Sequence, residues 1–206
     1  MNSQFDHSDV KILKQQIVYQ GHFQIEQWKV QFRLFNGGWS QPILREVFER
    51  GEAVGVLLFD ANNDQLVLIE QFRVGIVNKA KTPWLMEIVA GVIKKDEVLE
   101  QVARRETQEE SGLEITNLFP IYQYWVSPGG SSERMHLFCG QIDAKLAQGI
   151  HGVAEEGEDI RLHVLSLKSA FDLLSQGKIN NSSTIIALQW LQLNEQIVRA
   201  AFFKNE

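Results

Sequence analysis

The stretch from Gly91 to Leu113, GVIKKDEVLEQVARRETQEESGL, constrains this chain more than any other part of it. Apolar residues recur in it at the i, i+3, i+4 spacing that defines one face of a helix. A helix is therefore predicted over residues 97–111, with Gly112 as the residue that ends it. The apolar residues that define this face are Leu99, Val102 and Ala103.

Carboxylates take the next positions on that face, at Glu106, Glu109 and Glu110. Glu106 repels the other two at i+3 and i+4 spacing, by about 0.2–0.5 kcal/mol each. Glu109 and Glu110 lie near the negative end of the helix dipole, and burial would add a desolvation cost. Arg105 alone cannot neutralise three carboxylates, whereas a divalent cation with oxygen ligands can. The alternative is a solvated acidic face without a ligand, but the shared Leu and Val stripe favours a metal site.

The same stretch resembles the signature of the Nudix family. That signature reads Gly, five residues, Glu, seven residues, Arg-Glu, an apolar residue, any residue, Glu-Glu, any residue, Gly and an apolar residue. An aliphatic residue is usual where this chain has Thr107, which lies beside the stripe and supplies no ligand, so the exchange should be tolerated. The matching positions are Gly91, Glu97, Arg105, Glu106, Thr107, Glu109, Glu110, Gly112 and Leu113.

The resemblance implies an α/β fold, a Nudix-type α/β/α sandwich with a mixed sheet. It implies Mg²⁺ as cofactor, with Mn²⁺ as a possible substitute. Glu106 and Glu110 correspond to the main ligands, with the backbone carbonyl of Ala90 completing the site. Glu109 and Glu97 are further ligands or groups beside the ligands. Arg105 is expected to pair with a carboxylate of a loop, because its guanidinium favours bidentate partners.

An acidic loop over residues 149–159 is a second candidate for chemistry. Its composition is typical of a solvated surface loop. Hydrolysis nevertheless needs a base near phosphorus, and the Glu residues of the Nudix signature (called the box from here on) are expected to bind metal. By resemblance to ADP-ribose-hydrolysing Nudix enzymes, Glu156 is the expected base, with Glu155 as its rival. Glu158 is the expected contact to metal or water.

Substrate choice depends on Pro128, which lies fifteen residues after Leu113. A proline at this distance marks the ADP-ribose branch of the Nudix family, although an ordinary hairpin loop would look the same. Arg73 is the preferred contact to the diphosphate, because its planar fork matches phosphate oxygens. The resemblance places the adenosine near two arginines, stacks the adenine on a Phe and puts a Glu at the terminal ribose. The candidates for substrate binding are Phe23, Arg45, Glu46, Arg50, Arg73, Val92, Ser127, Pro128, Gly129 and Glu133.

Two domains are expected, a small N-terminal β subdomain over residues 1–50 and a Nudix domain over 51–206. Residues 18–34 tend to alternate apolar and polar, which predicts one or two strands, and 43–48 predicts a third. Such a piece either docks on a partner subunit to form a homodimer or folds as a flap on its own domain. Further strands are expected over 53–59, 65–72, 84–89, 115–126, 134–142 and 161–165, and further helices over 168–176 and 183–203.

Composition narrows the partners and the setting. The net charge of -6 argues against a nucleic-acid partner, since phosphate binding requires a basic face. A small anionic nucleotide is still compatible, because bound metal ions reverse the local charge. The lone Cys139 fits a reducing compartment, and no apolar run is long enough to span a membrane, so a cytoplasmic protein without membrane contact is expected.

The function implied by the resemblance is Mg²⁺-dependent hydrolysis of the diphosphate bond of ADP-ribose to AMP and ribose 5-phosphate. One alternative is a Nudix pyrophosphatase acting on another nucleoside diphosphate linked to a second group, such as a sugar nucleotide or a dinucleotide. The other is a nucleotide-binding regulator without catalysis, which the intact carboxylates of the box disfavour.

Overall fold

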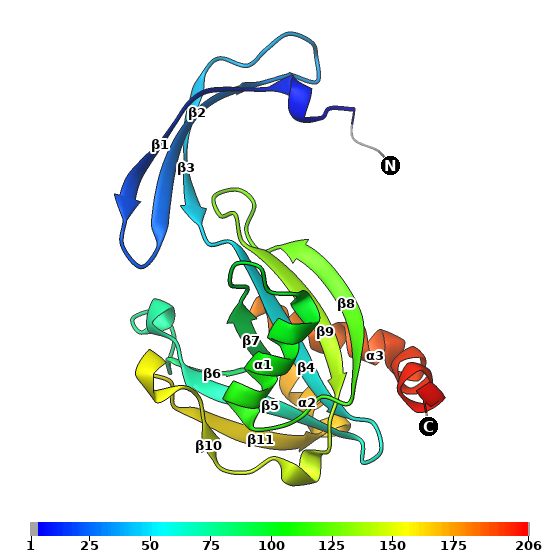
Figure 1. Cartoon of the computed structure of the whole chain (residues 1–206). Coiled ribbons are helices and arrows are strands. Elements are labelled where there is room, and N and C mark those ends of the chain that lie inside the picture. The colour runs from blue at the N-terminus through cyan, green and yellow to red at the C-terminus, as the bar shows by residue number, and fades with distance from the viewer. Residues whose placement is uncertain (1–3, 206) are drawn as a thin grey trace. The chain divides into compact units, whose positions relative to one another are not determined.

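The computed structural model describes residues 4–205, drawn in Figure 1. The chain divides into two compact units, Met1–Gly51 with Trp125–Arg134, and Glu52–Tyr124 with Met135–Glu206. The sequence assigned residues 125–134 to the second domain. They group with the first unit because the Phe48 N–H donates to the carbonyl of Gly130 and the Ser132 N–H donates to the carbonyl of Phe48.

The first unit contains an antiparallel sheet of three strands in the order β1-β2-β3. Its first strand begins at Val10, well before the predicted residue 18. Nearly every residue of this strand is exposed, so no core imposes the apolar alternation that would have marked its start. The strands are β1 (Val10–Gln20), β2 (Gln24–Phe32) and β3 (Ile43–Glu49).

The second unit is built on a sheet of eight strands. Six of them are neighbours in the order β10-β11-β5-β4-β9-β8, while β6 pairs with β5 and β7 pairs with β4. β5 is antiparallel to β4, β6 and β11. β9 runs parallel to β4, because the starts of both strands are joined by a bond from Arg134 N–H to Gly51 and their ends by one from Ile142 N–H to Phe59. The mixed sheet is thus confirmed. Its strands are β4 (Glu52–Asp60), β5 (Gln65–Phe72), β6 (Trp84–Glu87), β7 (Val89–Val92), β8 (Asn117–Trp125), β9 (Arg134–Gln141), β10 (Ile150–His151) and β11 (Ile160–Ser166).

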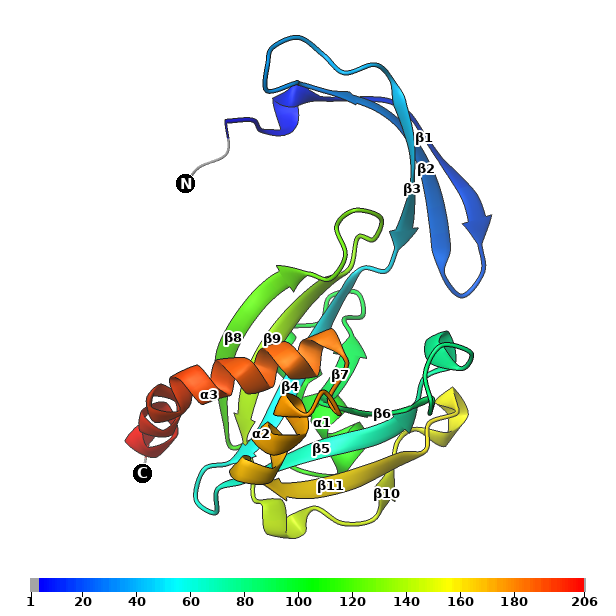
Figure 2. The ribbon, with the colours of Figure 1, turned by 180° about the vertical axis from the view of Figure 1, so that it is seen from behind.

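Helices cover both faces of this sheet, as Figures 1 and 2 show from opposite sides. Helix α1 (Leu99–Ser111) lies on one face, and α2 (Leu167–Ser175) and α3 (Ser182–Phe202) lie on the other. Val56 and Val67 of the sheet share one buried cluster with Val102 of α1. The predicted α/β/α sandwich is therefore confirmed. None of the described helices is long and apolar enough to cross a membrane.

Two predicted boundaries were wrong. Helix α1 begins at Leu99 rather than at residue 97, because Glu97 turns back to accept a hydrogen bond of 2.8 Å from the Lys94 N–H. The strand predicted over 84–89 is two strands, β6 and β7, which pair with different neighbours. Between them Ile88 donates its N–H to the Thr184 hydroxyl of α3 instead of to a strand, at 2.9 Å.

Candidate active site

Glu110 is the most deeply buried carboxylate of the box. It lies in the last turns of α1 with only 2% of its surface exposed, and it accepts a hydrogen bond of 2.9 Å from the Ala90 N–H. Burial is the main cause that raises its pKa to about 8, and the charges of Glu106 and Glu158 act in the same direction. A cation bound close to this carboxylate would therefore be favoured, because it would stabilise the charged form of Glu110.

Glu106 lies one turn before Glu110 and points at the backbone of Gly91. A Cβ atom at Gly91 would come within 1.8 Å of the Glu106 carboxyl carbon, so the glycine provides the space in which this carboxylate sits. Burial is the main cause that raises the pKa of Glu106, and the neighbouring Arg105 opposes the shift. Strand β7 and helix α1 thus bring two partly desolvated carboxylates together.

The backbone of Ala90 faces the same carboxylates. Its N–H donates to Glu110 on α1, which is the geometry of a residue whose pair with Gly55 lacks ladder hydrogen bonds. The carbonyl of such a residue points to the same side as its N–H. The carbonyl of Ala90 is therefore available on the side of β7 that faces the box.

Arg105 holds the box together, as expected. Its Nε and Nη2 donate to the two oxygens of Glu97 at 3.1 and 3.2 Å, and its Nη1 donates to Glu106 at 2.7 Å and to Glu109 at 2.9 Å. These contacts outweigh burial and raise the pKa of Arg105. With Glu97, Glu106 and Glu109 all turned to the guanidinium, no group of three His, Cys, Asp or Glu side chains in residues 4–205 is arranged to hold a metal ion.

The donors at this place nevertheless fit a divalent cation. Glu106 and Glu110 are carboxylates whose pKa values are raised by burial, and the Ala90 carbonyl is a third hard oxygen donor. A bound cation would remove the cost of holding both charges in a desolvated position. Glu109 is turned to Arg105 and is less buried than either of them.

The acidic loop is fastened to the end of α1. The Gly152 N–H donates to the carbonyl of Glu109 at 3.1 Å, and the Val153 N–H donates to the carboxylate of Glu158 at 2.9 Å. The charge of Glu158 is close enough to raise the pKa values of Glu106 and Glu110, so the structure brings this residue to the box. Glu155 and Glu156 lie in an exposed 3-10 turn of the same loop.

Arg73 also belongs to this site. Its charge lowers the pKa of Glu110, and its Nε donates to the carboxylate of Glu87 at 2.8 Å. Gln71 donates to the same oxygen of Glu87 at 3.2 Å, so Glu87 fixes the arginine. Glu87 was not among the residues predicted from the sequence. A lone carboxylate in the apolar run of residues 84–89 was the signal that could have identified it.

Val92 follows Gly91 on β7 and is half exposed. The other candidates for substrate binding lie in the first unit, which is described by itself. There Arg50 stacks over the ring of Phe23 at 4.6 Å and contacts Glu133 at 3.4 Å. Phe48 meets Phe23 edge-on, with 5.0 Å between the ring centroids. The structure thus gathers Phe23, Arg50 and Glu133.

The remaining candidates for substrate binding lie in a tight turn or are exposed on a strand. The Ser127 carbonyl accepts the N–H groups of Gly130 and Ser131 at 3.1 and 2.9 Å, which closes the turn containing Pro128 and Gly129. Arg45 and Glu46 are exposed on β3 and do not join the cluster of Phe23, Arg50 and Glu133. Arg45 donates to the carbonyl of Leu44, at 2.8 Å.

Comparison with known proteins agrees with this geometry. Residues 49–201 match the NUDIX domain. The chain is 46% identical over 195 residues to an ADP-ribose pyrophosphatase of Escherichia coli (strain K12), covering 95% of this chain and 93% of that one. It is 42% identical over 193 residues to an ADP-ribose pyrophosphatase of Haemophilus influenzae, covering 92% and 89%.

Two further likenesses are more distant. A GDP-mannose pyrophosphatase of Escherichia coli (strain UTI89 / UPEC) is 35% identical over 152 residues, covering 73% of this chain and 78% of that one. A crystal structure of an ADP compounds hydrolase superposes with a TM-score of 0.68 at 22% identity, covering 90% and 96%, which shows a shared fold. With the signature, the sandwich and these matches in agreement, the chain belongs to the Nudix family of hydrolases.

Proposed function

We propose that this protein hydrolyses the diphosphate bond of ADP-ribose, giving AMP and ribose 5-phosphate, with Mg²⁺ as cofactor. The observation that carries the proposal is the pair of carboxylates formed by the partly buried Glu106 and the buried Glu110, enclosed by β7 and α1 at the positions of the family signature. The substrate is proposed from relatives that are 42–46% identical and named ADP-ribose pyrophosphatase.

Glu106, Glu110 and the Ala90 carbonyl would hold the metal ion, with Glu109 and Glu158 as additional oxygen donors nearby. When bound, such an ion neutralises charge on the diphosphate oxygens and lowers the pKa of water. Nudix hydrolases generally use divalent metal ions, and hard carboxylate and carbonyl oxygens favour Mg²⁺ or Mn²⁺ among them.

Arg73 binds the diphosphate in this proposal. Glu87 holds its Nε, and among residues 4–205 no hydrogen bond occupies either terminal nitrogen of the guanidinium, so both can donate to phosphate oxygens. Glu156 accepts the proton of the attacking water, since it lies in the loop that carries Glu158 and has no partner that fixes it among the described residues.

The first unit supplies recognition of the remaining parts of the substrate. Phe23, stacked by Arg50, offers an aromatic face for adenine, and Glu133 accepts hydroxyl groups of the terminal ribose. Arg45, Glu46 and the turn of Ser127, Pro128 and Gly129 are further proposed contacts, as is Val92 in the second unit. A homodimer is proposed because large apolar side chains of β1 to β3 are exposed.

The test is a panel of ADP-ribose, GDP-mannose and a dinucleotide, each with and without Mg²⁺, with the products separated. ADP-ribose should give AMP and ribose 5-phosphate at the highest kcat/KM, and activity should disappear when a chelator removes the metal. GDP-mannose is included because of the relative named for it. A higher kcat/KM for GDP-mannose would replace the proposed substrate, and turnover without metal would remove the proposed role of the box.

A first prediction concerns Gly91. In Gly91→Ala the new Cβ would collide with the Glu106 carboxylate, so we expect the Mg²⁺ concentration for half-maximal activity to rise at least about tenfold. Gly75→Ala is the matched control, because nothing lies within 4 Å of a Cβ at that position. A metal requirement unchanged in Gly91→Ala would place the metal away from Glu106.

A further inference from the structure

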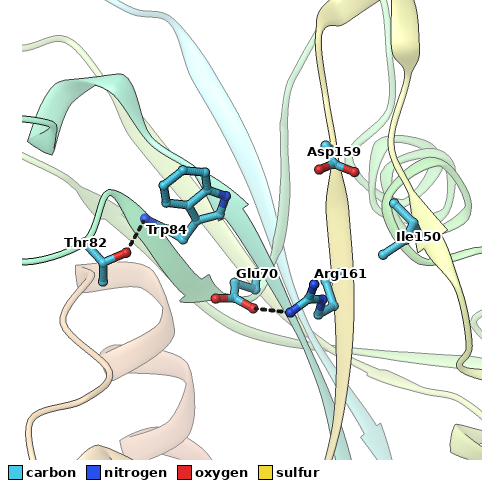
Figure 3. Close-up of a pocket in the computed structure, with 6 residues that line it drawn as sticks. All are labelled: Glu70, Thr82, Trp84, Ile150, Asp159 and Arg161. Atoms are coloured by element: carbon cyan, nitrogen blue, oxygen red, sulfur yellow. Dashed lines mark hydrogen bonds and ion pairs between the residues drawn. The ribbon is translucent and has the colours of Figure 1, made fainter.

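A hollow of about 360 Å³ lies in the second unit, away from the carboxylates of the box. Figure 3 shows Trp84 and Thr82 on one side of it, Ile150 and Asp159 on the other, and the pair of Glu70 and Arg161 between them. This volume is at the lower end of the range, about 300–1,000 Å³, that is typical of small-molecule sites. Its lining residues are Glu70, Thr82, Trp84, Ile150, Asp159 and Arg161.

Strand register places this hollow on the opposite side of the sheet from the Nudix helix. Glu70 of β5 pairs with Arg161 of β11, which pairs in turn with Ile150 of β10, so these three side chains share one face. The preceding residues Ile69 and Ile160 are fully buried in the cluster that contains α1. Because successive side chains of a strand point to opposite faces, the hollow and the box are separated by the sheet.

The hydrogen-bonding groups of the hollow are only partly used within the protein. Glu70 accepts a hydrogen bond of 2.9 Å from His163, while Arg161 is 3.9 Å from it, too far for a hydrogen bond. The guanidinium of Arg161 therefore keeps its donors available. Within residues 4–205 the carboxylate of Asp159 makes no hydrogen bond and no ion pair, so it is a free acceptor at the rim.

Trp84 adds an aromatic surface. It is 50% exposed, and Phe72 supports its ring edge-on with 5.4 Å between the centroids. Its backbone N–H donates to the Thr82 hydroxyl oxygen at 3.3 Å, which leaves the hydroxyl proton of Thr82 free to donate. A half-exposed indole held in place by another ring is a ready contact surface for a flat or ring-shaped ligand.

The charges of the lining decide the class of ligand. Two carboxylates, Glu70 and Asp159, oppose a phosphate or another anion, and a simple cation has no acceptor for the donors of Arg161. A ligand that both donates and accepts hydrogen bonds without net charge satisfies all of these groups. We propose that the hollow is a second binding site, for a neutral monosaccharide whose ring lies on Trp84 and whose hydroxyl groups bond to Asp159 and Arg161.

The experiment is a titration of the ¹⁵N-labelled full chain with D-ribose and with D-glucose, followed by NMR. The indole N–H signal of Trp84, assigned with Trp84→Phe, and the backbone signal of Ile150 should shift and saturate by about 10 mM, which corresponds to a Kd of about 1 mM. Asp159→Asn and Arg161→Gln should each weaken binding at least about tenfold. Tyr122→Ala, an exposed aromatic of β8 outside this hollow, should leave binding unchanged.

A charged comparator and one active-site variant complete the design. Ribose 5-phosphate should bind at least tenfold more weakly than ribose, because its phosphate is repelled by Glu70 and Asp159. A response to ribose 5-phosphate as strong as that to ribose, or no saturation with either neutral sugar, would overturn the proposal. The titration is repeated in Glu110→Gln, where the sugar response should persist, so that its outcome is separate from that of the proposed hydrolysis.

Discussion

Glu110 shows how one residue links burial to chemistry. A carboxylate with 2% exposure is normally found paired with a cation, yet its hydrogen bond within the protein comes from the backbone of Ala90. Its pKa of about 8 is the result, and burial contributes most of the shift. The protein thus holds a proton at a position where a divalent ion would replace it.

This shift has a consequence for stability. The pKa of Glu110 rises from 4.5 in the unfolded chain to about 8, so between these values the folded protein binds more protons than the unfolded one. The free energy of unfolding of metal-free protein should therefore fall as pH rises through this window, by at most about 1.4 kcal/mol per pH unit from this group.

Glu110→Gln tests that sign. Urea unfolding of the chelator-treated variant at pH 5 to 8 should show a smaller loss of stability with rising pH than the wild type. Glu100→Gln, an exposed residue of the same helix, should behave as the wild type does. Parallel pH profiles for Glu110→Gln and wild type would contradict the raised pKa.

The acidic loop offers a second comparison between single residues. Glu156→Gln should lower kcat by about 10²–10⁴-fold, the usual contribution of a general base, while metal affinity stays unchanged. Glu158→Gln should weaken metal binding, because the charge of Glu158 already reaches Glu106 and Glu110. Calorimetric titration with Mg²⁺ and single-turnover rates separate the two effects. A loss below tenfold in Glu156→Gln would move the base to Glu155 or Glu158.

At the scale of one element, helix α1 has a buried polar residue, Thr107, where the family usually has an aliphatic one. Thr107 was expected beside the apolar stripe, but it is fully buried. Its hydroxyl makes no hydrogen bond to any described residue. A buried polar group without a partner lowers the free energy of unfolding, and a Val at this position would remove that loss.

We therefore expect Thr107→Val to raise the free energy of unfolding by about 1 kcal/mol and to leave kcat unchanged. The matched control is Thr184→Val in α3, another fully buried threonine, whose hydroxyl accepts the Ile88 N–H. That variant should lose stability by about 1–3 kcal/mol, because it leaves a buried N–H unpaired. Thermal and urea unfolding of both variants give the comparison, and a stabilised Thr184→Val would refute the argument.

At the scale of the whole molecule, the first unit leaves an apolar surface open. Ile12 and Ile17 of β1 are 55% and 52% exposed, in a sheet of three strands that has little core of its own. Exposed apolar patches of this kind are typical of surfaces that bind a partner. A second copy of the chain is the proposed partner.

The double variant Ile12→Asp/Ile17→Asp should therefore shift the mass in solution from two chains to one, because it puts two charges into the proposed interface. Light scattering coupled to gel filtration measures this mass. Gln20→Asp, at the end of the same strand, adds a charge without removing an apolar side chain and should remain a dimer. A monomeric wild type would end the proposal.

The sequence by itself determined the signature, its helix and the family, because these depend on the spacing of residues within one continuous stretch, Gly91 to Leu113. It also determined the glycine that ends α1: Gly112 adopts the left-handed conformation that an L side chain rarely takes. For Arg105 the sequence predicted a loop carboxylate as partner without naming it, and only the structure identifies that partner as Glu97.

Only the tertiary structure decided what depends on contacts between distant segments. The split of β6 from β7 is caused by Thr184, and Arg73 is held by Glu87 across the β5–β6 pair. The hollow beside Trp84 exists because strand register puts Glu70, Arg161 and Ile150 in one row. The spacing of residues along one segment does not specify the register between strands. The sequence could therefore predict the metal-binding carboxylates of the box, but not which side chains lie together on the opposite face of the sheet.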